Sequence, residues 1–475
     1  RKAVEIAPNA LWIELIADEY TWWGKLEYRK GNLEEALDYF SYAIQIDPQN
    51  SQAYFQRSLA LYDSGDAEGA EEDLDEFIIL SVDNWAYSQS ANARVQWGDL
   101  EGALSDLTTA VSVDPENYNL YLERAKLFHD LGRLDEANDD LTKYIDLGQN
   151  DLHTYLNSGQ TRMNWRDIDG AIADFTKAIE SEPEYSETYF ERANAWLEKE
   201  DFDKAWADFE VYIELSSDLA RAYDRRGQAL VEYGETEQGI EDFTTAVEIN
   251  PEFDMAFVHR GRAYTDLGDF ESALSDFDKA IQINPRNSDA YTGRGVVFYT
   301  QGKLTESLAE FTTAIDITPG NAYLFVRRGM AFLDLERTGR ALEDFETAID
   351  LDPTYEWGYA YRGTVYYGES NNEAAIADFD KAIELGMVNV WIYEYRGLAH
   401  YFNGDNEKAI EDFSFAVELD PFYADPYWAR AQAYQETGQF EAALSDLQMF
   451  VELRPDQNNQ SVLETIGEIE AQLNR

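Results

Sequence analysis

Proline recurs along this chain at a fixed interval. Every gap in the main series is 34 or 68 residues, the members being Pro115, Pro183, Pro251, Pro285, Pro319, Pro353, Pro421 and Pro455. An aromatic residue keeps the same interval, at Tyr121, Tyr155, Tyr189, Tyr223, Phe257, Tyr291, Phe325, Tyr359, Tyr393 and Tyr427. Self-similarity at one period of 20 to 50 residues is the signature of stacked repeats. We therefore expect a row of similar units and not a set of globular domains.

Each unit carries the same internal pattern. Arg follows the aromatic residue by three positions and is followed by a small residue, as in Arg260-Gly261. Further on come an alanine, an acidic residue before Phe, and an Ala-Ile or Ala-Val pair, as in Ala273, Asp276-Phe277 and Ala280-Ile281. Apolar residues at i, i+3, i+4 and i+7 predict two amphipathic helices per unit. Gly-Asp pairs such as Gly268-Asp269 are expected to end the first helix, and the proline ends the second.

This pattern resembles the tetratricopeptide repeat, and the resemblance covers residues 17–457. Repeats are placed at 17–50, 51–83 and 84–117, and then every 34 residues to 424–457, with the second repeat one residue short in its closing loop. The resemblance implies an all-α fold, a right-handed superhelical solenoid of about 13 antiparallel helix-turn-helix repeats. Residues 1–16 are predicted to be a partial repeat with an extended first helix. Residues 458–475 are predicted to form an amphipathic C-terminal capping helix.

Two repeated features predict specific contacts. Glycine recurs at one position inside the first helix, from Gly24 to Gly397, although Gly in a helix costs about 1 kcal/mol relative to Ala. We therefore expect the partner helix to approach closely there. The recurrent Arg and the acidic residue before the buried Phe, such as Arg260 and Asp276, predict a ladder of ion pairs that links the hairpins.

The charge balance limits the partners. With 94 acidic and 37 basic residues the formal charge is −57, which repels nucleic acid and anionic lipid. No apolar run approaches the ~20 residues needed to span a bilayer. The chain has no cysteine, so thiolate metal sites are excluded. No bound cofactor or metal is expected, with loosely held calcium on the acidic faces as the alternative. The sequence leaves the cellular compartment undetermined. It is either the cytoplasm or, after removal of an upstream signal, the exterior of the cell.

No catalytic or phosphate-binding motif stands out from the repeat. The four histidines are scattered, without the spacing of a nucleophile or metal site, and no glycine-rich phosphate loop is present. We therefore expect no enzyme.

The resemblance implies which first-helix side chains face the concave groove, and two groups stand out there. The basic group consists of Arg221, Arg225, His259, Arg262 and Arg327. In so acidic a chain, this group suggests recognition of an anionic moiety such as a peptide carboxylate. The alternative is that these side chains neutralise acidic neighbours.

The aromatic group consists of Tyr299, Tyr323, Trp357, Tyr361, Tyr367, Trp391, Tyr395, Tyr401 and Trp428. Trp357 and Tyr361, and likewise Trp391 and Tyr395, are spaced i, i+4 and share a helix face. Such rings anchor peptides or pack against sugar rings. The alternative is that they are simply buried between hairpins.

Two functions follow from this reading. The first is a scaffold that binds a peptide or protein segment in its groove. The second is a self-assembling structural protein that forms head-to-tail filaments, aided by divalent cations outside the cell. In that arrangement residues 461–473 would supply a first helix, and residues 1–9 part of a second helix, to a repeat completed between two molecules.

Overall fold

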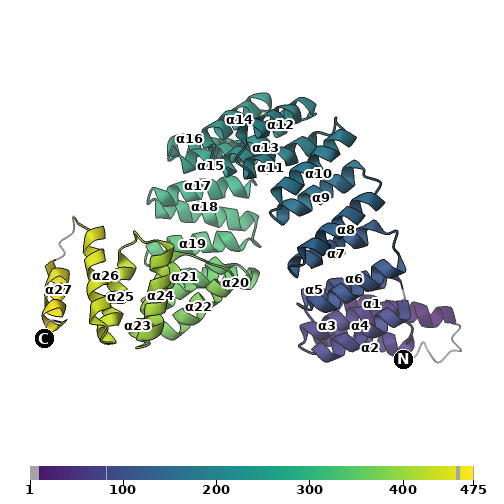
Figure 1. The fold of residues 1–475 in the computed structure, drawn as a ribbon, viewed down its shortest axis with the longest axis horizontal. Helices are drawn as coiled ribbons and strands as arrows, with labels where there is room; N and C mark the ends of the chain where they lie inside the picture. The colour runs from purple at the N-terminus through teal and green to yellow at the C-terminus, as the bar shows by residue number, and fades with distance from the viewer. Residues whose placement is uncertain (1–9, 82, 456–459, 474–475) are drawn as a thin grey trace. The chain divides into compact units, whose positions relative to one another are not determined.

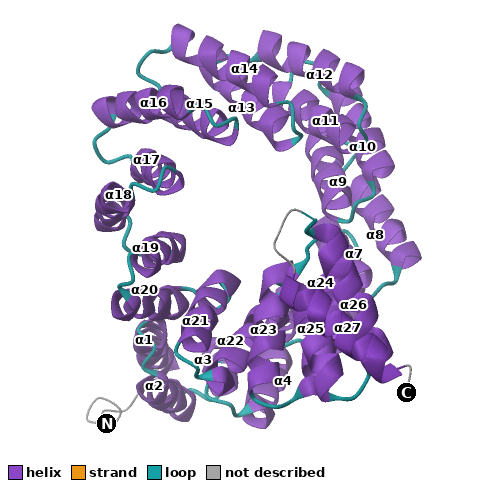
Figure 2. Ribbon diagram, turned by 90° about the vertical axis from the view of Figure 1, so that its left-hand side faces the viewer, coloured by secondary structure: helices purple, strands orange, loops and turns teal. Residues whose placement is uncertain are grey.

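The computed structural model describes residues 10–81, 83–455 and 460–473, and every regular element in these ranges is a helix. The helices pair into 13 consecutive hairpins followed by one further helix, which confirms the predicted all-α fold and the repeat count. Figure 2 shows the helices joined by short loops, with no strand in the described part. The predicted partial repeat at residues 1–9 lies outside the described residues.

The chain divides into two compact units, Arg1–Ser217 and Asp218–Arg475, a division that the periodicity does not reveal. The first unit holds six hairpins, drawn from purple to blue in Figure 1. Its helices are α1 Ala10–Arg29, α2 Leu33–Ile46, α3 Ser51–Asp63, α4 Ala67–Ser81, α5 Asn84–Gln96, α6 Leu100–Val113, α7 Tyr118–Asp130, α8 Leu134–Leu147, α9 Leu152–Asn164, α10 Ile168–Ser181, α11 Ser186–Glu198 and α12 Phe202–Leu215. Helix α1 has 20 residues where the other first helices of this unit have 13.

The second unit holds seven hairpins and the final helix. Its helices are α13 Leu219–Glu232, α14 Thr236–Ile249, α15 Asp254–Asp266, α16 Phe270–Ile283, α17 Ser288–Thr300, α18 Leu304–Ile317, α19 Ala322–Asp334, α20 Thr338–Leu351, α21 Glu356–Gly368, α22 Asn372–Glu384, α23 Val390–Phe402, α24 Asn406–Leu419, α25 Asp425–Glu436, α26 Phe440–Leu453 and α27 Gln460–Leu473. The odd-numbered first helices of successive hairpins contact one another from α13 to α17 and from α19 to α25. They form one face of this unit, which we call the first-helix face.

The recurrent glycine lies against the recurrent phenylalanine of the same hairpin. A Cβ atom placed on Gly397 would lie 2.7 Å from Phe413 Cε1 and 3.2 Å from Asp412 Cβ. Gly261, Gly329 and Gly363 meet the corresponding rings in the same way, at 2.5 to 2.9 Å. Phe413 is completely buried, so its ring cannot move aside. The predicted close approach is therefore confirmed, and its steric reason is the ring itself.

The recurrent arginine closes its own hairpin and, in most of the repeats that carry it, also reaches the preceding hairpin. Arg260 donates Nε and Nη2 to the two carboxylate oxygens of Asp276 in its own hairpin, both at 2.7 Å. Its Nη1 donates to Thr244 Oγ1 of the preceding hairpin at 3.0 Å. The ion pair recurs at Arg57, Arg124, Arg192, Arg226, Arg294, Arg328, Arg362, Arg396 and Arg430. The predicted pairs are present, but the carboxylate closes the arginine's own hairpin and the third nitrogen makes the link between hairpins.

The aromatic residue three positions earlier holds the guanidinium in place. The Arg260 guanidinium carbon lies 5.6 Å from the centre of the Phe257 ring, and Arg430 lies equally close to Tyr427. The Tyr427 hydroxyl donates to the carbonyl of Pro421, at the end of the preceding second helix. The periodic aromatic residue, arginine and proline are therefore parts of one contact set.

Three repeats lack the arginine: Trp23 stands at its position in the first, and the other two carry serine. Ser90 and Ser158 stand at its position and donate to Asp106 and Asp174. The same carboxylates accept from Arg94 and Arg162, one helical turn further on, at 3.1 and 3.0 Å. The ion pair to the acidic residue is therefore retained, but its arginine stands four residues later in the helix. The periodic pattern does not show this exchange.

We predict opposite effects for alanine at two helical glycines. Gly397→Ala places a methyl group against the buried Phe413 ring and should lower the free energy of unfolding by about 1–3 kcal/mol. Gly467→Ala in α27 is the matched control, because no atom lies within 4 Å of a Cβ there. It should raise the stability by up to about 1 kcal/mol. Urea unfolding followed by circular dichroism distinguishes them, and equal effects of the two substitutions would contradict the steric account.

Candidate functional site

The first-helix face of the second unit carries most of the side chains that the sequence singles out. The basic group does not gather at one point. Arg221 on α13 is exposed and lies 3.8 Å from Asp218, and Arg225 on the same helix is half-buried. His259 Nδ1 lies 2.8 Å from Asp224 Oδ1, and Arg262 donates to Asp289. Acidic neighbours therefore accompany Arg221, His259 and Arg262, as the alternative interpretation expected.

Arg327 on α19 is the exception within the basic group. Its Nε donates to the Tyr323 hydroxyl at 2.8 Å, and the guanidinium carbon lies 5.1 Å from that ring's centre. No carboxylate of the described residues lies within 4 Å of it, although the side chain is half-buried. Other described arginines without a carboxylate at this distance, namely Arg29, Arg166, Arg286 and Arg337, are exposed. Arg327 therefore keeps donors available for an anion that the described chain does not supply.

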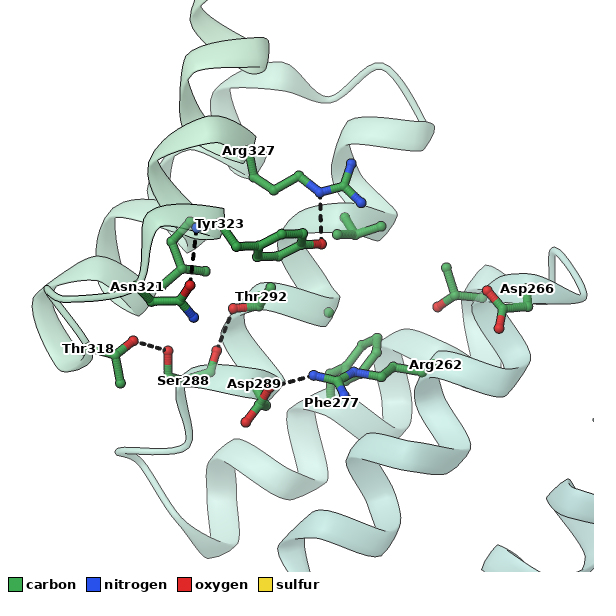
Figure 3. A pocket seen from close by; sticks show the side chains of 14 residues that line it. Arg262, Asp266, Phe277, Ser288, Asp289, Thr292, Thr318, Asn321, Tyr323 and Arg327 are labelled. Atoms are coloured by element: carbon green, nitrogen blue, oxygen red, sulfur yellow. Dashed lines mark hydrogen bonds and ion pairs between the residues drawn. The ribbon is translucent and has the colours of Figure 1, made fainter. Parts of the chain in front are cut away.

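A pocket of about 510 Å³ lies between Arg262 and Arg327 (Figure 3). Gly293, a second glycine of α17, is among the residues that line it. A Cβ on Gly293 would lie 2.4 Å from the Phe277 ring, which also lines the pocket. Figure 3 shows Arg327 and Tyr323 on one side of the pocket and Arg262 with Asp289 on the other. The pocket thus combines an apolar ring with two guanidinium groups.

Five residues of the predicted aromatic group form one continuous set on α21 and α23. Ring centres lie 5.8 Å apart for Trp357 and Tyr361, 6.3 Å for Trp357 and Trp391, and 6.1 Å for Trp391 and Tyr395. Tyr367 meets Tyr395 edge to face at 5.3 Å. The sequence missed a sixth member, Phe402, whose ring lies 6.3 Å from Tyr367 and is 62% exposed. We call these six residues the aromatic wall.

The other predicted aromatic residues lie outside this set, although Tyr401 adjoins it. The Tyr299 hydroxyl donates to Asp334 Oδ2 at 2.5 Å, and burial raises the pKa of Tyr299. Tyr323 supports Arg327. Tyr401 packs against the core of the α23–α24 hairpin, and its ring centre lies 5.5 Å from that of Phe402. Trp428 on α25 is 43% exposed. The residues of the wall are only partly buried. They therefore pack between hairpins, as one alternative expected, and also keep surface that could contact a ligand, as the other expected.

Burial controls the titration of the tyrosines beside this face. Burial raises the pKa of Tyr355, which follows α20 and precedes α21, to about 12, with the nearby charge of Arg327 acting in the opposite direction. Burial also raises the pKa of Tyr361, Tyr367 and Tyr395. The wall therefore presents neutral phenol rings at physiological pH.

Among the described residues, no group of three or more His, Cys, Asp or Glu is placed to hold a metal ion. In the same part of the chain, no helix is both long enough and apolar enough to cross a membrane.

We predict that Tyr355 makes the fold sensitive to alkali. The folded state keeps a phenol proton up to a pKa of about 12, whereas an unfolded tyrosine loses it near pH 10. Its contribution to stability is therefore complete below about pH 10 and is lost as the pH rises from 10 toward 12. Tyr355→Phe should flatten this part of the stability curve, measured by urea unfolding at several pH values. An unchanged slope in the variant would show that Tyr355 titrates normally.

Comparison with known proteins gives matches along most of the chain. Models described as tetratricopeptide repeat match residues 17–50, 89–151, 156–220, 220–253, 326–389 and 424–457, and one described as TPR repeat matches residues 261–302 and 401–438. No curated protein sequence matches the chain.

Several solved structures are similar to it. The crystal structure of the APC/C hetero-tetramer Cut9-Hcn1 is 15% identical over 95% of this chain and 96% of that chain, with a TM-score of 0.47. Yeast Tom70 is 16% identical over 90% and 97%, with a TM-score of 0.41. A tetratricopeptide repeat protein from Parabacteroides merdae ATCC 43184 is 22% identical over 52% of this chain and 98% of its own, with a TM-score of 0.42.

Proposed function

Because the chain belongs to the tetratricopeptide repeat family, whose solenoids are typically protein-interaction scaffolds, we propose that it is a non-enzymatic scaffold that binds a peptide or protein segment. The segment lies along the first-helix face of the second unit. The observation that carries this proposal is the aromatic wall, a continuous set of partly exposed rings on α21 and α23. Large exposed aromatic patches on a soluble protein mark interaction sites.

The chemistry of the face favours a peptide. Aromatic residues and arginine are enriched at the energetically dominant points of protein interfaces. Arg327 on α19 lies one hairpin before the wall and offers donors to an acidic side chain or a terminal carboxylate. Packed helices lie about 8–10 Å apart, so α19 to α23 covers roughly 20 Å. An extended peptide of about six residues spans that distance at roughly 3.3 Å per residue.

The titratable groups on this face support binding over catalysis. His259 and Asp224 form a pair of the kind that orients a general base. However, no hydroxyl or thiol of the described residues lies within hydrogen-bond distance of His259. Asp224 also accepts from Gln228 Nε2 at 2.9 Å, so the pair is part of a structural network.

The wall can be tested by selecting peptides. Random twelve-residue peptides displayed on phage are selected on the immobilised full chain. We expect selected peptides to bind the wild type and Trp206→Ala, and to lose about tenfold or more in affinity with Trp357→Ala or Trp391→Ala, because interface tryptophans commonly contribute about 2 kcal/mol or more. Trp206 is the matched control, being 40% exposed on α12 of the other unit. Equal binding by all four proteins, with circular dichroism unchanged, would refute the proposed site.

Self-assembly is the second candidate, and helix α27 favours it. Helix α27 resembles the first helix of a repeat, and no atom lies within 4 Å of a Cβ placed on its Gly467. In the complete hairpins, Gly397 and its counterparts face a phenylalanine ring instead. Leu463 on α27 is 54% exposed. A helix from a second copy could cover this side of α27, with divalent cations reducing the repulsion between acidic surfaces.

Light scattering after size exclusion tests this second candidate. Head-to-tail assembly predicts particles that grow with protein concentration and with calcium. Deletion of residues 1–9 or 461–473 should return the monomer. A monomer at every concentration, with and without calcium, would exclude assembly. That result would not bear on the proposal of peptide binding.

A further inference from the structure

The close contacts between successive first helices are interrupted at the pocket beside Arg327. They run from α13 to α17 and resume from α19 to α25. The pocket, of about 510 Å³, is lined by residues of α15, α17 and α19, on both sides of this interruption. Position 6 of the repeat holds His259 on α15 and Arg327 on α19, whereas α17 has Gly293 and no side chain there. The first-helix face therefore contains a cavity within the range of small-ligand sites, about 300–1,000 Å³.

Several polar groups of the lining have partners within the chain. Thr292 Oγ1 donates to the Ser288 carbonyl at 2.7 Å, and Ser288 Oγ lies 2.7 Å from Thr318 Oγ1. Four lining residues carry a charge, and two of them, Arg262 and Asp289, form an ion pair with each other. The charges of this pair cancel, so the remaining two charged residues decide which ligand the pocket takes.

These two residues, Arg327 and Asp266, have opposite charges. Arg327 donates through Nε to the Tyr323 hydroxyl, and its Nη1 and Nη2 have no partner among the described residues. Asp266 is the last residue of α15, and its carboxylate has neither a hydrogen-bond donor nor a cation from the described chain. Partial burial raises the pKa of Asp266, and no nearby cation counteracts that effect. Figure 3 shows Arg327 and Asp266 at different sides of the pocket.

The charge of the chain restricts the anion that can reach Arg327. The formal charge of −57 repels a simple anion as it approaches. Salt screens partly buried charges much less than exposed ones, so the carboxylates that line the cavity add to this repulsion. A phosphate group with two charges is repelled more than a carboxylate. A ligand that also carries a positive group has no net charge, and Asp266 lines the same cavity as a partner for that group.

We propose that this pocket binds a zwitterionic ligand, with its carboxylate at Arg327 and its ammonium or guanidinium group at Asp266. Two sources share this chemistry. One is a small ω-amino acid, and the other is an acidic and a basic side chain carried together by the bound segment. The pocket does not depend on the proposed peptide-binding function, and only the second source rests on it.

The lining accounts for each part of such a ligand. Nη1 and Nη2 of Arg327 can donate two hydrogen bonds to one carboxylate, the geometry that makes arginine–carboxylate pairs strong. The Tyr323 hydroxyl accepts from Arg327 Nε, so its own proton can be donated to the same carboxylate. Val296 and Leu324 also line the cavity and offer apolar surface to the methylene groups between the two charges.

The pocket can be tested with 6-aminohexanoate, a zwitterion with five methylene groups between its charges. Ligand-observed saturation-transfer NMR on the full chain at about 0.15 M salt gives the dissociation constants. Hexanoate lacks the ammonium group, and 6-aminohexan-1-ol lacks the carboxylate. We expect 6-aminohexanoate to bind at least about tenfold more tightly than either, because only this compound forms both charge-assisted contacts.

Substitutions locate the binding. Arg327→Gln and Asp266→Asn should each weaken the binding of 6-aminohexanoate by about tenfold or more. Arg337→Gln is the control for the arginine, since Arg337 is exposed and lies outside the pocket. Asp130→Asn is the control for the aspartate, because Asp130 ends the first helix α7 in the other unit as Asp266 ends α15. Both controls should bind as the wild type does, with circular dichroism unchanged in all four variants.

Equal binding of 6-aminohexanoate by the wild type, Arg327→Gln and Asp266→Asn would overturn the proposal, as would hexanoate binding as tightly as 6-aminohexanoate. Competition with the selected peptides then identifies the source. Displacement of a peptide by 6-aminohexanoate assigns the two charges to the bound segment, and simultaneous binding assigns them to a small molecule. If 6-aminohexanoate binds as expected while selected peptides ignore Trp357 and Trp391, the pocket stands and the peptide-binding function fails.

Discussion

The close contact between a helical glycine and a phenylalanine ring is the constraint on which this structure depends. At Gly397 and Phe413 it brings the two helices of the hairpin so close that a Cβ at the glycine would overlap the ring, whereas repeats with another residue there carry only Ala or Ser. Because each hairpin buries its apolar face only against its neighbours, an error at one contact would shift every later one. The 34-residue period in the sequence reflects the repetition of this contact between a small residue of the first helix and a large apolar residue of the second.

The arginine network joins neighbouring hairpins through buried and part-buried hydrogen bonds. Arg260 bonds to Asp276 in its own hairpin and to Thr244 in the preceding one, while Phe257 lies beside its guanidinium. Such a pair adds specificity of register more than net stability, because both charges lose water on burial. With these groups holding the fold, positions 2, 5, 6, 9 and 12 of the first helices are left to vary. Arg327 and every residue of the aromatic wall except Phe402, which is at position 13, occupy this variable set.

The fold could be predicted from sequence because its determinants are periodic, and the site could not because its determinants are departures from the period. The proline, glycine and Asp-Phe positions identify the hairpins directly. The pocket depends on Gly293, a glycine outside the recurrent position, and on the Phe277 ring of the preceding hairpin. Phe402 was missed because it follows Tyr401 at the helix end, where the pattern is least strict.

The central claim is that the first-helix face of the second unit binds an extended peptide segment along the aromatic wall. A crystal structure of the full chain with a selected peptide tests this most directly. The account predicts peptide density running across α19, α21 and α23, with an acidic group at Arg327 and apolar side chains against the aromatic wall. A peptide bound instead against the second helices α20, α22 and α24 would contradict it.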